Sequence, residues 1–264
     1  MRAKYKILVL VNLNEFTDGI IISAIELAKK INAEISLFHV KKATDIVKRE
    51  NQLSAVRAIN SDYNVTDKKI KLLVNEISKA HQIPIKYAFA IGNVKHELDQ
   101  LLENSQPDII VLGKPVSKTF SFMGDNMVKY VLKNHAGGVL VVDPKNRIRP
   151  KEDVVVATLN SSSTNPRLPY LEDLFKTSHT PLKSFKIVNK GIKPKDLNAK
   201  NTGKTVEYVF EKGDNSIRNL SKYLSLNNIN VLCLDLGANE TESDYAIINM
   251  DRVLEHLNVS ILVS

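Results

Sequence analysis

Cysteine and long hydrophobic runs are scarce in this sequence. Its 264 residues contain a single cysteine, Cys233, so no disulfide can form within the chain. No stretch approaches the roughly 18–20 consecutive apolar residues that a membrane-spanning helix requires. The apolar stretch near the N-terminus is too short for a secretory signal and lacks a cleavage pattern. These absences predict a soluble, cytoplasmic protein without a membrane partner.

The motifs of common enzymes are also missing. The chain has no G-x-S-x-G elbow, and Cys233 lies inside an apolar run, which favours a place in the core. The six histidines lack the spacing of metal ligands, and we expect His39 to bond to neighbouring backbone. The segment "TGKT" (202–205) resembles a P-loop, but Asn198 replaces its first glycine and a strand follows. We therefore predict neither an enzyme nor a metal site.

Positive charge exceeds negative charge. The formal net charge is +8, which would suit an acidic partner. The lysines, however, are spread over many segments, and no arginine-rich arm or nucleic-acid motif is present. We expect a solvated, lysine-rich surface and no specific nucleic-acid partner. Weak attraction to phosphates or to a membrane surface is left open.

Apolar periodicity predicts alternating strands and helices. Strands that are apolar throughout indicate a parallel sheet covered on both faces, because such strands have no solvent side for polar residues. A long polar segment, 41–65, separates the second strand from the next helix, which we expect to begin near Lys68. The five expected strands are "YKILVLVN" (5–12), "AEISLFHV" (33–40), "IKYAFAIG" (85–92), "DIIVLG" (108–113) and "GGVLVVD" (137–143).

The second half of the chain repeats the first. A charged, proline-flanked linker, 144–153, separates two units, which we place at 1–146 and 153–264. The second unit is shorter because the segment before "GKTVEY" has no helical apolar face, so we expect a loop or a missing helix there. The last helix and last strand of each unit match at a constant offset in residue number. The matching positions are Val128, Val131, Leu132 and 139–141 in the first unit and Met250, Val253, Leu254 and 261–263 in the second.

The runs that carry these patterns resemble a known family. "ILVLVN", "ELAKKINAEISLFHV", "GNVKHELDQLLENSQPDIIVLG" and "VKYVLKNHAGGVLVV" are similar to universal stress proteins over nearly the whole first half, and the second half resembles a worn copy. The resemblance implies two tandem α/β domains, each with a doubly wound, five-stranded parallel sheet in the order 3-2-1-4-5. It places a ligand crevice where the order reverses, above the first and fourth strands.

The closing strands of the two halves are expected to meet. Members of the family with one domain usually dimerise through this last strand, and both copies here keep an apolar edge that would otherwise be exposed. We therefore predict an internal dimer with a pseudo-two-fold axis, built through 138–143 and 259–264. Further association of whole chains is left open.

The resemblance also places an adenine-nucleotide site in the first half. Nucleotide-binding members carry a loop resembling G-x2-G-x9-G-S/T after the fourth strand, whose glycines let backbone amides approach the phosphates. This loop keeps Gly113, but Val116 replaces the second glycine and Asp125 the third, with Gly124 one position early. An aspartate would repel phosphate, so ATP or AMP should bind weakly or not at all.

Further positions of that site follow from the same resemblance. The aspartate that usually ends the first strand is Asn12 here, matched by Asn160 in the second half, where the acidic segment after Gly237 predicts that the site is lost. Val40 matches the position whose backbone reads the adenine edge, and Lys114 could reach a phosphate. The candidate nucleotide-binding residues are thus Asn12, Val40, Gly113, Lys114, Gly124 and Asn126.

Three functions are compatible with these patterns. The favoured one is a regulatory stress-response protein, with or without an adenine nucleotide in its first half and with no other cofactor. The second is a pure interaction module that binds an unknown protein partner. The third is an adenylating enzyme, which would need an S-G-G-x-D-S loop or an H-x-G-H element that the chain lacks.

Overall fold

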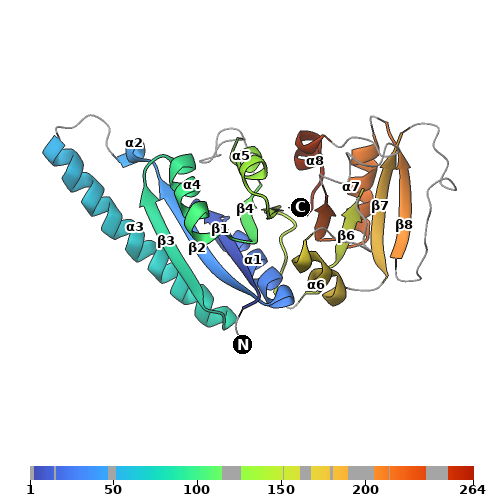
Figure 1. Cartoon of the computed structure of the whole chain (residues 1–264), viewed down its shortest axis with the longest axis horizontal. Helices are drawn as coiled ribbons and strands as arrows, with labels where there is room; N and C mark the ends of the chain where they lie inside the picture. The colour runs from blue at the N-terminus through green and yellow to red at the C-terminus, as the bar shows by residue number, and fades with distance from the viewer. Residues whose placement is uncertain are drawn as a thin grey trace.

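A computed structural model places most of the chain in one mixed sheet (Figure 1). It describes residues 3–14, 16–46, 52–114, 126–150, 152–160, 168–178, 181–189, 205–213, 215–235 and 249–264. Within these residues the sheet has ten strands in the order β3-β2-β1-β4-β5-β10-β9-β6-β7-β8. No helix in the described ranges is long and apolar enough to span a bilayer.

The first half forms the predicted five-stranded parallel unit. Its strand order is 3-2-1-4-5, so the order reverses between β1 and β4, where Ile7 pairs with Ile109. The apolar runs become strands because they are buried from both sides, as β5 shows with every residue buried. The strands are β1 (Tyr5–Val11), β2 (Ala33–Lys41), β3 (Ile85–Ile91), β4 (Ile109–Gly113) and β5 (Gly138–Val142).

Helices cover both faces of this unit. One face packs under α1 and α3, whose apolar stripes join residues of β1, β2 and β4 in one core cluster. The other face packs under α4 and α5, where Leu98 and Val131 are fully buried. The helices are α1 (Thr17–Ile31), α2 (Ala43–Ile46), α3 (Gln52–His81), α4 (Val94–Ser105) and α5 (Asn126–Asn134).

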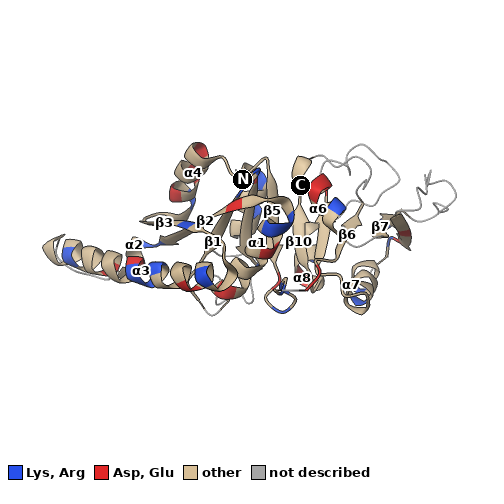
Figure 2. Cartoon of the chain, turned by 90° about the horizontal axis from the view of Figure 1, so that it is seen from below, with Lys and Arg blue, Asp and Glu red and all other residues tan. Residues whose placement is uncertain are grey.

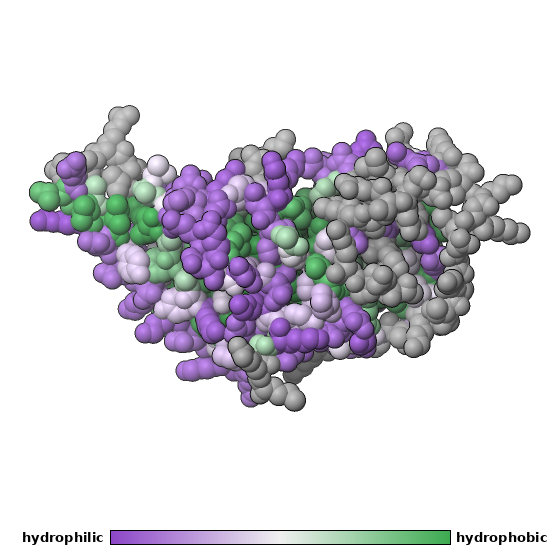
Figure 3. All heavy atoms as spheres, in the orientation of Figure 1, coloured by the Kyte–Doolittle hydropathy of each residue, from purple (hydrophilic) through white to green (hydrophobic). Residues whose placement is uncertain are grey.

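The start of α3 corrects the sequence-based expectation. The helix begins at Gln52 instead of near Lys68, so most of the polar segment is helical. Two tertiary contacts anchor the helix at residues 62 and 63: Lys41 forms a 2.6 Å ion pair with Asp62, and the ring of Tyr63 lies 4.4 Å from that of Phe89. The free end of α3 projects beyond the sheet and is apolar in part (Figures 1 and 3).

The second half repeats the unit in the order 10-9-6-7-8. Among the described residues, no helix corresponding to α3 lies between β7 and β8; residues 190–204 are outside them. The segment "TGKT" leads into β8, as expected. The elements are β6 (Val156–Leu159), α6 (Pro169–Thr177), β7 (Leu182–Val188), β8 (Thr205–Glu211), α7 (Ser216–Leu226), β9 (Val231–Leu234), α8 (Met250–His256) and β10 (Ser260–Val263).

The two halves join as predicted, through their closing strands. β5 and β10 pair antiparallel, with Leu140 opposite Leu262. The seam is reinforced where α1 contacts α6 and where the Tyr5 ring meets that of Tyr170 edge-on, 6.1 Å away. The sheet and one core cluster therefore run through both halves without a break.

The linker between the halves is packed, although its charges suggest a solvated segment. Asp143 accepts backbone hydrogen bonds from Lys145 and Asn146, which turns the chain away from β5. Ile148 is fully buried in the shared core, and the Arg147 side chain lies against Gly19 of α1. These contacts hold the linker between the two halves.

Candidate functional site

The carboxyl ends of β1 and β4 bring Asn12 and Gly113 to the point where the strand order reverses. Asn12 directly follows β1, and its Oδ1 atom is buried without a hydrogen-bond partner among the described residues. Val40, near the end of the neighbouring β2, is buried in the core. A buried amide oxygen without a donor is costly, and the described residues supply no donor to Asn12.

Backbone and lysine contacts tie the ends of β1 and β2 together. His39 Nδ1 lies 2.8 Å from the Val11 carbonyl, which confirms the expected backbone bond. Burial lowers the pKa of His39, and Lys41 and Lys69 oppose its protonation further, so the imidazole donates to Val11 as a neutral ring. Lys69 donates to the carbonyl of Leu13, a residue with a positive φ of 54°. These bonds fix the backbone at the mouth of the crevice.

Gly113 and Lys114 serve the packing of the chain. A Cβ atom on Gly113 would lie 2.6 Å from Cδ1 of Ile20, so α1 approaches this strand end closely. The Lys114 ammonium donates 2.8 Å to the carbonyl of Leu257, 143 residues away, and lies 3.4 Å from Asp143. Lys114 is thereby committed to the contact with the second half.

A cavity of about 540 Å³ lies at the carboxyl ends of β2 and β3. It is bordered by the segment after β2, by the turn from β3 into α4, and by the first turn of α5. Asn93 caps α4 by accepting from the amides of Lys95 and His96. The lining residues are Lys42, Ala43, Thr44, Gly92, Asn93, Val94, Lys95 and Met127, none of which was a candidate from sequence.

One signal in the sequence could have drawn attention to this cavity. Asn93 stands between Gly92 and a helical apolar pattern, which is a typical N-cap position next to a strand end. Lys42 and Met127 carry no such signal, because they meet only through the fold. Of the remaining candidates, Gly124 lies outside the described residues, and Asn126 is the first residue of α5.

Comparison with solved structures identifies the architecture. No family model and no curated protein matches the sequence. A universal stress protein from Archaeoglobus fulgidus matches with a TM-score of 0.71 at 13% identity, covering 99% of this chain and 96% of the other. A putative universal stress protein from Pseudomonas aeruginosa UCBPP-PA14 matches with a TM-score of 0.53 at 11% identity, covering 98% and 92%.

The fold is that of a tandem universal stress protein. A functionally unknown protein from Pseudomonas aeruginosa PAO1 also matches, with a TM-score of 0.54 at 11% identity over 98% of this chain and 92% of the other. At these identities the comparisons establish the fold of both halves, as the resemblance implied. The residues at the sites of this tandem stress-protein fold must be judged from their own geometry.

Asn160 occupies a different register from the one that the sequence comparison gave it. The sequence comparison matched Asn160 to Asn12. When the paired strands β1 and β4 are matched to the paired strands β6 and β9, Asn160 instead corresponds to Val11, one position earlier. Strands buried on both faces have no alternation that would reveal such a shift. Residue 161, which follows Asn160 in the sequence, lies outside the described residues. The equivalent ladder pairs are Ile7 with Ile109 in the first half and Val156 with Val231 in the second.

The side chain of Asn160 serves the sheet. It is fully buried, adopts a positive φ of 48°, and accepts a 2.8 Å hydrogen bond from the Ile187 amide of β7. Residues 236–248, which carry the acidic segment of the second half, are outside the described ranges. In the second half of this stress-protein fold, the Oδ1 atom of the asparagine therefore completes the sheet.

Cys233 lies in the core, as its apolar run predicts. It is 3% exposed, and burial raises the pKa of its thiol to about 12. A protonated thiol is a poor nucleophile. Among the described residues, no three His, Cys, Asp or Glu side chains gather as metal ligands would.

Proposed function

We propose that the chain is a regulatory stress-response protein whose first half keeps a weakened adenine-nucleotide site and whose second half has none. The observation that carries the proposal is the Oδ1 atom of Asn12 at the topological switch point, which is buried and has no hydrogen-bond partner among the described residues. In this site Asn12 would bond the ribose, and the backbone near Val40 would face the adenine. Gly113, Gly124 and Asn126 would lie nearest the phosphates.

The proposed weakness has three causes. Asn12 lacks the charge that would help to hold a metal-bound phosphate. Lys114 already bonds the Leu257 carbonyl and contributes no charge to the crevice. By sequence, Val116 and Asp125 replace two glycines of the phosphate loop, both outside the described residues. Each missing hydrogen bond costs about 1–3 kcal/mol, and every 1.4 kcal/mol is a factor of ten in affinity.

Calorimetry of the purified protein with ATP and Mg²⁺, and with AMP, tests this proposal. We expect dissociation constants weaker than about 100 µM, equivalent to about −5.5 kcal/mol. The double variant Val116→Gly/Asp125→Gly should bind ATP more tightly than the natural chain. The variant Asn12→Asp, tested separately, should also bind ATP more tightly. Tightly bound ATP in the natural protein would contradict the weakness, and no gain in either variant would contradict its causes.

A pure interaction module is the second candidate. It is favoured by the commitment of Lys114 to the second half and by Asn160, which completes the sheet. Under this function neither half would bind nucleotide at any concentration reached in calorimetry. An adenylating activity has no support from the residues around the crevice, and no reaction is proposed.

A further inference from the structure

A groove with basic edges runs between α7 and α8, far from the nucleotide crevice. Because α7 leads into β9, its C-terminal end lies at the amino ends of the strands, whereas the crevice lies at their carboxyl ends. The groove has a volume of about 670 Å³. Its lining residues are Arg218, Ser221, Lys222, Ser225, Leu226, Glu255, His256 and Asn258.

Small residues open this groove, and basic residues flank it. Ser221 is 9% exposed and forms the floor, where Ser225 donates its hydroxyl to the Ser221 carbonyl of the same helix. Arg218 and Lys222 are exposed one turn apart, and neither forms an ion pair within the described part of the chain. α7 contains no acidic residue, so it appears blue and tan in Figure 2.

The first half shows how the same place can be closed. Counting from the match of Val131 to Val253, the helices α4 and α5 correspond to α7 and α8. In the first half the Tyr130 hydroxyl donates to both carboxylate oxygens of Asp99, each at 2.6 Å, and so bridges the two helices. The counterparts of this pair are Arg252 and Ser221, which form no such bridge in the described structure.

The charges of the two helices also differ in sign. α4 carries the half-buried Asp99 and the exposed Glu103, where α7 has Ser221 and Ser225. Conversely, α7 carries Lys222 in place of an uncharged glutamine, and Arg218 in place of a histidine. On these two helices the duplication has thus produced an acidic face in one half and a basic face in the other, whereas on the partner helices Lys133 of α5 corresponds to Glu255 of α8. The substituted positions of the first half are His96, Asp99, Gln100 and Glu103.

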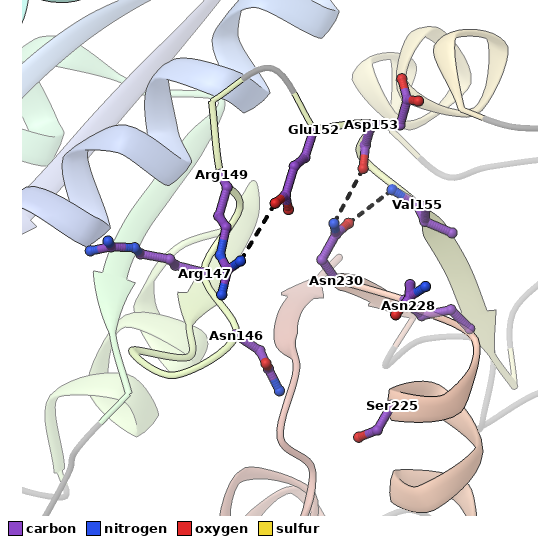
Figure 4. Close-up of a pocket in the computed structure, with 10 residues that line it drawn as sticks. Asn146, Arg147, Arg149, Glu152, Asp153, Val155, Ser225, Asn228 and Asn230 are labelled. Atoms are coloured by element: carbon purple, nitrogen blue, oxygen red, sulfur yellow. Dashed lines mark hydrogen bonds and ion pairs between the residues drawn. The ribbon is translucent and has the colours of Figure 1, made fainter.

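The groove has an apolar end and a polar extension. Leu226, at the end of α7, is 83% exposed, which leaves a large apolar side chain for a partner to cover. Ser225 also lines a second cavity, of about 580 Å³, beside the linker (Figure 4). There Arg149 and Glu152 point toward each other in an ion pair of 3.5 Å, so they neutralise one another.

We propose that the α7–α8 groove binds a short acidic segment of a partner protein that also carries a leucine-like side chain. Carboxylates would pair with Arg218 and Lys222, while the apolar side chain would cover Leu226. Glu255 is the acidic residue on the rim, and it lies 3.9 Å from His256. No aromatic side chain lines the groove to stack on bases, so a peptide fits better than a nucleic acid.

Nuclear magnetic resonance of the full chain tests this inference. The probe is a synthetic peptide of glutamate, aspartate and leucine, added to ¹⁵N-labelled protein at low salt. We expect amide shifts in α7 and α8 and none in α4 and α5, with binding weakened by added salt. A matched peptide with serine for leucine should bind at least about tenfold more weakly. Shifts absent from α7 and α8 would overturn the proposal.

Two variants locate the binding surface. Arg218→Glu/Lys222→Glu reverses two exposed charges and should abolish the shifts, whereas Lys68→Glu/Lys71→Glu on exposed α3 makes the same change in net charge and should preserve them. Ser221→Asp/Arg252→Tyr installs the closing pair of the first half and should also remove binding. Equal loss in the α3 variant, or equally strong binding of DNA, would show general polyanion attraction and contradict a peptide site.

This inference is independent of the proposed nucleotide site. The groove shares no residue with the crevice, so ATP affinity should be the same in Arg218→Glu/Lys222→Glu and in the natural chain. Loss of peptide binding with unchanged ATP affinity would separate the two sites. Circular dichroism of each variant shows whether a loss reflects unfolding.

Discussion

Leu140 of β5 lies opposite Leu262 of β10, and each residue is the other's counterpart in the internal repeat. A residue that faces its own counterpart across an antiparallel pair marks the pseudo-two-fold axis of the molecule. Both leucines are fully buried in the core cluster that spans the halves. The seam between the halves is therefore built like the interior of one domain.

Leu140 and Leu262 should be energetically coupled across the seam. Leu140→Ala and Leu262→Ala are each expected to lower the free energy of unfolding by about 2–5 kcal/mol, because each leaves a cavity in a closed core. Since the side chains are cross-strand neighbours, the double variant should cost less than the sum of the single ones. Urea unfolding of all four proteins measures this coupling. Strict additivity, or two separate unfolding transitions, would contradict a continuous core.

Gly138 and Tyr170 form a second close contact between the halves, and variants at each residue should change the stability of the chain. A Cβ atom on Gly138 would overlap the Tyr170 hydroxyl, so Gly138→Ala should destabilise the chain by about 1–3 kcal/mol. The buried hydroxyl of Tyr170 has no hydrogen-bond partner in the described structure, so Tyr170→Phe should raise stability by about 1 kcal/mol. Thermal unfolding would test both. A destabilised Tyr170→Phe variant would mean that the hydroxyl has a bonding partner.

Lys114 should hold the halves together without contributing to nucleotide binding. Lys114→Met leaves the Leu257 carbonyl without its donor and removes the cation from buried Asp143, so stability should fall by about 1–3 kcal/mol. ATP affinity should stay within about twofold of the natural chain. Unfolding and calorimetry on one preparation check both. A tenfold loss of ATP affinity would show that Lys114 contributes to nucleotide binding in the crevice.

Cys233 gives the chain a dependence on alkaline pH. Burial raises its pKa from 9.0 to about 12, so the unfolded thiol loses its proton at lower pH than the folded one. The contribution to stability is therefore complete below pH 9 and is lost as the pH rises toward about 12. Unfolding at about pH 8 and pH 10 should show a smaller decline in Cys233→Val than in the natural chain.

The reactivity of Cys233 offers an independent check on its burial. A thiol reagent at about pH 8 should modify the folded chain slowly and the urea-unfolded chain at once, because only the thiolate reacts. Rapid modification of the folded protein would show that the thiol is accessible. In that case the alkaline dependence would have another origin.

The sequence by itself determined the elements that depend on local pattern. Continuous apolar runs specified the strands of the first half, and the register shared by Val131 and Val253 specified the duplication. The apolar closing strands predicted the seam, because two such edges are stable only when covered. These features depend on short-range period and composition, which the printed sequence contains in full.

Tertiary structure alone decided the features that depend on distant partners. In the polar first half of α3, Lys41 pairs with Asp62 and Tyr63 packs on Phe89, contacts that no local pattern reveals. The Lys114 side chain donates to a carbonyl 143 residues away. The strand pairing shows that Asn160 corresponds to Val11 of the first half, and not to Asn12 as the sequence comparison suggested. Polar side chains choose their partners only after the backbone is placed, because their hydrogen bonds are directional and short.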